Sequence, residues 1–514
     1  MNYPVAAFPN SHRTTAPGAV SKPTPIPVRR TGVELKPDME RVLFRPFVFG
    51  DIGRVGRVLG RIGQLSEKQV DFWLEEVWSE FGERHVKLLE FFRRRFDEVK
   101  SQTLTDEALS ESRQLLIGSY FTQEYALECA ALFNPSMVWA PDQSDVPEGS
   151  RRFNVSLRAT GEGHISSLCF RSGLISPDGT ITIDPTAPFV TAPQVLPDTT
   201  YEKASFAASM DELNLNDGFP SRVLDNLNDT FTLGELESTI DNVLRRNRAH
   251  ADVWKPMAKT MISFAKANYE VACDPSSNIS ENCIFPYSPH ETNGIEDARF
   301  VEFVDDDGTS QYYATYTAYD GSVTFPQLVH TRDFTRFKIS TLNGQAVQNK
   351  GMALFPRKVR DHYAMIGRQD GENLYLMYSD DLHFWRTKEL LTKPTFPWEF
   401  VQIGNCGSPI ETDEGWLLLS HGVGPMRKYS IGAYLLDLED PSRVIGRLTR
   451  PLLAPNENER EGYVPNVVYS CGGLIYNQWL VLPYAMADYA SSFALVELEP
   501  LLRELKRNCS PVCE

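Results

Sequence analysis

Signatures of the common catalytic and metal-binding classes are absent from this chain of 514 residues. It has no Walker loop, no Gly-x-Gly-x-x-Gly motif after a predicted strand and no Gly-x-Ser-x-Gly motif. These absences exclude the usual nucleotide-binding and serine-hydrolase patterns. The sequence also lacks a Cys-x-x-Cys pair and a zinc signature, so we expect no metal site.

Cysteine is sparse and scattered, and we expect most of the thiols to be small buried side chains. Cys509 and Cys513 have a spacing that suits a metal or a disulfide, but no partner lies near them in the sequence, and a frayed end is the simpler interpretation. The eight cysteines are Cys129, Cys169, Cys273, Cys283, Cys406, Cys471, Cys509 and Cys513.

Long apolar runs and a secretion signal are missing as well. No uninterrupted apolar stretch reaches about 18 residues, and the first residues lack a basic start and an apolar core. We therefore expect a cytoplasmic protein. The net charge of −17, from 68 acidic and 51 basic residues, repels nucleic acid and anionic membranes and leaves a small molecule as the expected partner.

The first quarter of the chain is predicted to contain an arm and a helical region. Residues 1–33 are rich in Pro, Ser, Thr and Ala and predict a flexible arm, and residues 34–133 form a helical N-terminal region. Within that region, helical spacing of apolar residues predicts helices over residues 66–100 and 105–133.

The first of these helices has a clear start signal. Ser66 and Gln69 form a capping-box pattern at its beginning. We expect Trp73 and Trp78 on its buried face.

From residue 134 to 514 short strand-like runs dominate, interrupted by a predicted helical insertion at about residues 202–270. Short strands separated by turns are typical of an all-β sandwich or propeller. Residues 330–337 and 378–385 each end a strand with a polar residue, Asp and an aromatic residue. Such repeated units favour a mainly β propeller domain.

The most informative motif is residues 294–300, in which Glu296 and Asp297 stand beside Arg299. The strand that follows is rich in tyrosine, includes Tyr316 and ends at Asp320. Tyrosine suits pyranose rings, and a carboxylic acid beside an arginine suits proton transfer or binding of sugar hydroxyls. We therefore predict a carbohydrate site, for which the structural alternative is an Asp–Arg ion pair and a tyrosine-packed core.

Residues 294–300 resemble the Glu-Asp-Pro-Arg signature of glycoside hydrolase family 130, with Ala298 in place of the usual Pro. The resemblance extends over residues 130–500 and is interrupted by the predicted helical insertion. The further blocks that agree in order and spacing are Asn134-Pro135, Arg158, residues 350–356, Arg368, residues 403–423, residues 429–441, residues 462–468 and Ala487-Asp488.

This resemblance implies a five-bladed β-propeller with the active site in its central funnel. Members of the family are mostly inverting phosphorylases that cleave β-mannosides with inorganic phosphate and give α-mannose 1-phosphate, and a minority are hydrolases. Inorganic phosphate would thus be a co-substrate, and no other cofactor is expected.

The resemblance also implies roles for individual residues. Asp297 would be the proton donor, acting through the 3-hydroxyl of the mannose, and its pKa should be raised for this task. We expect the sugar to be held by Arg158, Glu296, Arg299 and Asp488, and also by Tyr316 and Asp320 of the tyrosine-rich strand.

Phosphate would be bound by Lys350, Arg368, His421 and Tyr429, because a phosphate site needs concentrated cationic donors. Gln402 stands where the family has a Lys, and Arg427 or Lys428 would supply the missing charge. The contribution of His421 depends on its protonation near neutral pH. In the plain alternative, His421 is a structural histidine, and Lys350 and Arg368 are surface cations.

Two other functions remain open from the sequence. A β-mannosidase of the same family would need a carboxylate base, for which Glu162 and Glu461 are the candidates. A non-catalytic sugar-binding propeller is compatible with Ala298, but Asp297 argues against it. The predicted helices need partners for their apolar faces, either as a cap over the funnel or at the interface of a homo-oligomer.

Overall fold

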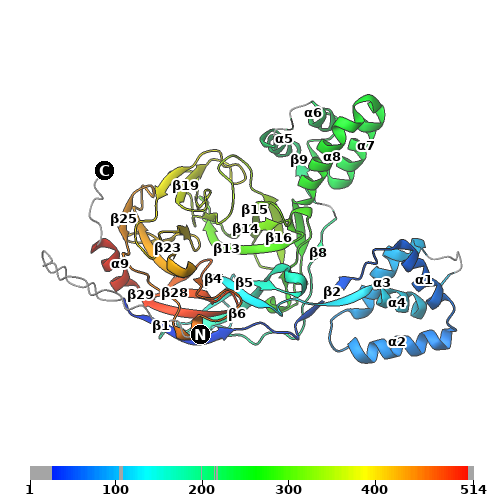
Figure 1. Cartoon of the computed structure of the whole chain (residues 1–514), viewed down its shortest axis with the longest axis horizontal. Coiled ribbons are helices and arrows are strands. Elements are labelled where there is room, and N and C mark those ends of the chain that lie inside the picture. Colours follow the sequence, from blue (N-terminus) through cyan, green and yellow to red (C-terminus); the bar gives the residue numbers. More distant parts are fainter. Residues whose placement is uncertain (1–25, 103–107, 198, 214, 216–217, 508–514) are drawn as a thin grey trace, which may run out of the picture.

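The computed structural model describes all residues except 1–25, 103–107, 198, 214, 216–217 and 508–514. Most of the described chain lies in a mainly β body formed by several antiparallel sheets. Figure 1 shows one group of helices on each of two arms that project from this body. Cys509 and Cys513, for which we predicted a frayed end, lie outside the described residues.

The strands of the body fall into five groups of four principal strands, which we call units 1 to 5, and neighbouring strands within a unit are antiparallel. Units 1 and 2 belong to one eleven-stranded sheet, in which Gly294 pairs in parallel with Ser166. Unit 1 contains β4 (Ala131–Trp139), β5 (Arg151–Thr160), β6 (Ser166–Ile175) and β7 (Ile181–Ile183). Unit 2 contains β13 (Gly294–Val304), β14 (Ser310–Tyr319), β15 (Thr324–Thr331) and β16 (Arg336–Thr341). Unit 3 contains β17 (Ala353–Leu354), β18 (Tyr363–Gly367), β19 (Leu374–Ser379) and β20 (Glu389–Thr392).

The last two units follow the same pattern. Unit 4 contains β21 (Gln402–Asn405), β23 (Gly415–Val423), β24 (Tyr429–Leu436) and β25 (Val444–Arg447), with β22 (Ile410–Thr412) beside β23. Unit 5 contains β26 (Val468–Tyr469), β28 (Trp479–Met486), β29 (Ala490–Glu497) and β1 (Val28–Leu35), with β27 (Leu474–Tyr476) beside β28.

These units succeed one another around a closed circuit. Strands of units 1 and 2, 2 and 3, 3 and 4, and 4 and 5 are in contact, and β28 and β29 of unit 5 return to β4 of unit 1. The outermost strand of unit 5 is β1, in which Val28 pairs with Val496. The predicted arm over residues 1–33 is therefore wrong for its last part, because this segment gains strand hydrogen bonds from the other end of the chain.

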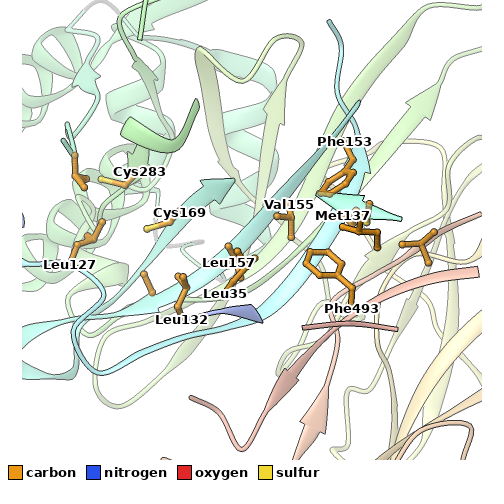
Figure 2. Packing of buried hydrophobic residues seen from close by; sticks show 14 of the residues in the cluster. Leu35, Leu127, Leu132, Met137, Phe153, Val155, Leu157, Cys169, Cys283 and Phe493 are labelled. Atoms are coloured by element: carbon orange, nitrogen blue, oxygen red, sulfur yellow. The ribbon is translucent and has the colours of Figure 1, made fainter. Parts of the chain in front are cut away.

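Buried apolar side chains hold units 1 and 5 together. Figure 2 shows Phe153, Val155 and Met137 of unit 1 close to Phe493 of unit 5. The rings of Phe153 and Phe493 are 6.0 Å apart. Full burial of such side chains contributes about 1.5–3 kcal/mol each to folding stability. This cluster therefore stabilises the contact between the last unit and the first.

The N-terminal helical group contains α1 (Ile52–Gly63), α2 (Glu67–Phe81), α3 (Leu88–Val99) and α4 (Glu111–Tyr120). The capping box is confirmed, because Gln69 Oε1 accepts a hydrogen bond of 2.9 Å from the Ser66 backbone N–H. Trp73 and Trp78 are about half exposed, so their predicted burial is wrong; the buried side of α2 begins at Val70 instead.

The predicted helix over residues 105–133 is too long. After α4 the chain continues as β3 (Thr122–Ala126), which pairs with β2 (Val42–Pro46), and then as β4. All residues of β4 are buried. A run that is apolar throughout fits a buried strand and a buried helix equally well by periodicity, so the sequence pattern could not separate them.

Between units 1 and 2 the chain forms the second helical group around its own apolar cluster. Its helices are α5 (Lys203–Glu212), α6 (Phe219–Leu224), α7 (Leu233–Arg246) and α8 (Ala251–Lys266), and β9 (Thr200–Glu202) pairs with β10 (Thr230–Thr232) at its base. Strands β8 (Gln194–Val195) and β11 (Tyr269–Ala272) extend the sheet of unit 2, and β12 (Cys283–Ile284) pairs with β6. Helix α9 (Leu498–Arg507) buries three leucines beside units 4 and 5.

No helix in the described part of the chain is long and apolar enough to cross a membrane.

Candidate active site

Three strained backbone positions mark the candidate site. Asn134 in β4, Asp297 in β13 and Asp488 in the turn after β28 have left-handed backbone angles, with φ of 51°, 54° and 50°. The strand register breaks beside Asn134 and at Asp297. Such irregularities turn side chains away from the sheet and cluster at functional sites. The amide of Asn134 donates a hydrogen bond of 2.6 Å to Asp297 Oδ1.

Cations surround the carboxylates of β13. Arg158 Nη2 donates a hydrogen bond of 2.9 Å to Glu296, and its Nη1 lies 3.5 Å from Asp297 Oδ1. Lys350 Nζ lies 3.5 Å from the other oxygen of Glu296. The structure therefore brings together four predicted site residues, which come from units 1 and 2 and from the connection between units 2 and 3.

Arg299 faces inward and is only 1% exposed. Its Nη1 donates to the backbone carbonyl of Asp297 and its Nη2 donates to the hydroxyl of Tyr469, both at 2.8 Å. These two contacts support the backbone at Asp297 in β13, and Arg299 Nη2 also lies 3.9 Å from Asp297 Oδ2. A contact between Arg299 and a sugar stays a prediction.

The two central carboxylates have opposite pKa shifts. Burial opposes ionisation of Asp297, but Arg158, Arg299 and Lys350 outweigh it and lower the pKa of Asp297 to about 2. Burial and the charge of Asp297 raise the pKa of Asp488 to about 6. The expectation of a raised pKa at Asp297 is thus wrong for this structure, in which three cations favour its ionised form.

Next to the carboxylates lies a second pair of polar side chains, Arg368 and His421, which we call the Arg368–His421 wall. Arg368 is 8% exposed, and its Nη1 donates to Nε2 of His421 at 3.3 Å. Its Nε has no hydrogen-bond partner, and no carboxylate of the described residues forms an ion pair with it. A buried guanidinium without an anion is costly, so this position favours an anionic ligand.

His421 is a neutral member of this wall. Burial and the charges of Arg368 and Arg299 lower the pKa of His421 well below its ordinary value. Because a guanidinium only donates, Nε2 of His421 accepts and its proton is assigned to Nδ1. His421 therefore adds polarity but no positive charge near neutral pH.

Two glycines make room for these side chains. A Cβ at Gly351 would lie 2.7 Å from Arg368 Nε, and a Cβ at Gly404 would collide with the His421 ring. Gln402 is two residues from Gly404 in β21 and so shares its face of the strand. Gln402 is thus placed beside the Arg368–His421 wall.

Aromatic side chains complete the wall. The rings of His421 and Tyr429 are 5.8 Å apart, and Tyr469 lies 4.8 Å from His421. Arg427 lies over the Tyr429 ring at 5.5 Å, and its charge also acts on Asp488. Arg427 and Lys428 were the two candidates for the positive charge that Gln402 lacks, and these contacts belong to Arg427.

Tyr316 and Asp320 lie in other surroundings. Tyr316 is 2% exposed and donates a hydrogen bond to Glu291. Asp320 accepts hydrogen bonds of 2.8 and 2.7 Å from Ser322 and Val323 within its own turn. These contacts make Tyr316 a core residue and Asp320 a turn residue, as in the structural alternative of the sequence motif.

Both candidate carboxylate bases are exposed on loops. Glu162 belongs to the loop that carries His164, and Glu461 is close in sequence to Tyr463. Tyr463 and His164 connect the two loops through a contact of 3.4 Å. The structure thus brings the connection between β5 and β6 of unit 1 close to the connection between units 4 and 5.

Sequence reasoning gave no role to Asn134 or Tyr469, although both lie in the matching blocks or directly beside them. Their contacts join residues 163 and 170 positions apart in the chain, so no local pattern reveals them. Among the described residues no group of three or more His, Cys, Asp or Glu side chains is arranged to hold a metal ion.

Comparison with known proteins identifies the family of this chain. The model of a family described as beta-1,4-mannooligosaccharide phosphorylase, glycoside hydrolase family 130, matches residues 255–507. A 1,2-beta-oligomannan phosphorylase from a Thermoanaerobacter species is 35% identical over 219 residues, which cover 41% of this chain and 71% of the relative. A Listeria innocua Beta-1,2-mannobiose phosphorylase is 30% identical over 43% of this chain and 63% of its own length.

The solved structure of the Listeria innocua Beta-1,2-mannobiose phosphorylase aligns with 75% of this chain and 94% of its own, at 19% identity and a TM-score of 0.43. The sequence relationship carries the assignment. This chain belongs to glycoside hydrolase family 130.

Proposed function

We propose that this protein cleaves short β-mannosides by phosphorolysis with inversion and releases α-mannose 1-phosphate. The observation that carries the proposal is Arg368, a buried guanidinium whose polar contact is with the neutral imidazole of His421. Arginine binds phosphate through parallel charge-assisted hydrogen bonds, and a bound phosphate would provide the missing counter-charge.

We propose that the five units are the blades of a five-bladed β-propeller. The closed circuit of contacts and the pairing of β1 with β29 support this architecture. The site residues come from strands and connections of different units, which is the arrangement expected at the centre of such a ring.

In the proposed reaction a phosphate oxygen attacks the anomeric carbon on the face opposite the glycosidic oxygen. The bond from that carbon to the glycosidic oxygen breaks, and the leaving oxygen takes a proton from Asp297 through the 3-hydroxyl of the mannose. Hydrogenphosphate supplies the proton that balances the reaction. We assign Arg158, Glu296 and Asp488 to the sugar, and Lys350, Arg368, His421 and Tyr429 to the phosphate.

The low pKa of Asp297 fits this scheme if phosphate binds first. A dianion beside Arg368 and Lys350 offsets the cations that favour the ionised form, and it repels the carboxylate charge. The pKa of Asp297 should therefore rise when phosphate binds, and the proton of hydrogenphosphate becomes available to it.

The test is an assay with mannobioses of each β-linkage in the presence and absence of phosphate. Phosphorolysis predicts mannose 1-phosphate and negligible turnover without phosphate. A β-mannosidase, the second candidate, is favoured by the uncharged Gln402 and by the proximity of the loops of Glu162 and Glu461. It predicts free mannose at a rate indifferent to phosphate, and binding without turnover of any mannobiose would leave the non-catalytic alternative.

A further inference from the structure

We propose that Tyr469 is a positioning residue that holds Arg299, and through it the backbone of Asp297, in the geometry required for proton transfer. The proposal rests on the proposed role of Asp297 in cleavage of the mannoside. It assigns a function to a side chain of β26 whose hydroxyl contacts Arg299 of β13.

A short chain of hydrogen bonds connects Tyr469 to the acid. The Tyr469 hydroxyl accepts from Arg299 Nη2 at 2.8 Å, and Arg299 Nη1 donates to the Asp297 carbonyl at 2.8 Å. Tyr469 is 5% exposed and Arg299 is 1% exposed. Since water has little access to either group, these protein contacts fix the orientation of the guanidinium.

The Asp297 backbone needs such support. Its left-handed conformation is uncommon for a residue other than glycine, and the register break removes regular strand pairing between Glu296 and Arg299. Strained positions of this kind persist where their surroundings over-determine them. The Arg299 contact with the Asp297 carbonyl supplies one such constraint, and Tyr469 orients the donor.

Tyr469 also reaches the proposed phosphate side. Its ring lies 4.8 Å from the His421 ring, and His421 accepts from Arg368. Burial raises the pKa of Tyr469 above its ordinary value, so its hydroxyl remains neutral and can accept from Arg299. Tyr469 therefore contacts both Arg299, which supports the Asp297 backbone, and His421, which belongs to the group that we assign to phosphate.

The test compares Tyr469→Phe with Tyr484→Phe. Tyr484 is a matched control because it is also buried in unit 5 and its hydroxyl donates at 2.8 Å to Glu459, outside the site. We expect Tyr469→Phe to lower kcat about 10- to 100-fold, with KM for mannoside and phosphate changed less than about threefold. Tyr484→Phe should leave kcat within about twofold of the wild-type value.

A crystal structure of Tyr469→Phe provides a readout that does not depend on activity. We expect the Arg299 guanidinium to lose its contact with the Asp297 carbonyl. An unchanged contact overturns the proposal whatever the activity, and so does wild-type kcat in a variant whose Arg299 has moved.

The same comparison separates this proposal from the proposed function. If the wild-type enzyme releases free mannose without phosphate, phosphorolysis fails, and the two phenylalanine variants are then compared on that hydrolysis. If no mannoside is cleaved at all, the proposed function fails and the crystal structure alone decides whether Tyr469 positions Arg299.

Discussion

Asp297 and Asp488 show how neighbouring carboxylates acquire opposite properties from their surroundings. Three cations act on Asp297, whereas Asp488 is buried beside the negative charge of Asp297. Pairs of carboxyl groups whose pKa values are shifted in opposite directions are typical of sites that transfer protons. This difference in pKa has a measurable consequence for stability.

We predict that Asp488→Asn stabilises the protein at pH 7 by about 1–3 kcal/mol and has little effect at pH 4. The pKa of Asp488 is raised in the folded protein to about 6, so the folded state holds this proton between about pH 4 and 6. The stability that it contributes is complete below about pH 4 and is lost as the pH rises through about 6. Thermal unfolding at both pH values measures the effect.

Asp297→Asn is the matched control for that prediction. The lowered pKa of Asp297 contributes stability above about pH 4 that is lost as the pH falls toward 2, so this variant should be less stable than the wild type at pH 7. It should also lose about 10²- to 10⁴-fold in turnover. The same sign for both variants at pH 7 would contradict the assigned charge states.

We predict that Arg368→Ala raises KM for phosphate roughly 10- to 100-fold while KM for the mannoside changes less than about threefold. The variant removes a charge-assisted bond that phosphate uses and the sugar does not, and such bonds contribute about 1.5–3 kcal/mol. Arg357→Ala is the control, because Arg357 pairs with Glu411 at the surface. Equal effects of Arg368→Ala on both substrates would assign Arg368 a structural role.

At the scale of a single strand, β21 offers a way to strengthen the anion site. We predict that Gln402→Lys lowers KM for phosphate about tenfold, which corresponds to about 1.4 kcal/mol. The new ammonium would lie on the face of β21 that adjoins Arg368 and His421. Gln402→Met, which keeps the length without the charge, is the control, and an equal effect of both variants would exclude electrostatic attraction.

Elements with strong local patterns could be predicted from the sequence, whereas those fixed by distant partners could not. Residues 233–269 have helical spacing and contain α7 and α8, and the signature around Asp297 is part of β13. In contrast, β1 is a strand because it pairs with β29 more than 450 positions away, and no local signal encodes that partner.

The candidate site shows the same division. The motif identified Glu296 and Asp297, and the wider family resemblance added Arg158 and Lys350, which the structure brings together with them. The inward direction of Arg299, the neutral state of His421 and the contact with Tyr469 follow from burial and from three-dimensional neighbours. The family resemblance therefore predicted the group around Asp297, whereas residue type misplaced Tyr316 and Asp320, which lie elsewhere.

At the scale of the whole molecule, β1 joins the beginning of the chain to the last unit. Arg30 of β1 forms a hydrogen-bonded ion pair of 2.6 Å with Glu459, which is buried and also accepts from Tyr484. Two features thus hold the circuit of units closed: the apolar side chains buried between units 1 and 5, and the pairing of β1 with β29 together with its ion pair to Glu459.

We predict that Arg30→Ala lowers the free energy of unfolding by about 1–3 kcal/mol, because it leaves the buried Glu459 without its cation. This value allows for the partial exposure of Arg30, whose side chain is 32% exposed. Lys36→Ala is the control at the exposed end of the same segment. A denaturant midpoint that is equal in both variants would show that the ion pair between Arg30 and Glu459 contributes little to stability.

The central claim, inverting phosphorolysis, is tested most directly by identifying the first product of a β-mannobiose by phosphorus and proton NMR. In millimolar phosphate we predict α-mannose 1-phosphate and mannose in equal amounts, with negligible turnover when phosphate is omitted. Release of two equivalents of free mannose, at a rate unchanged between zero and millimolar phosphate, would contradict the account.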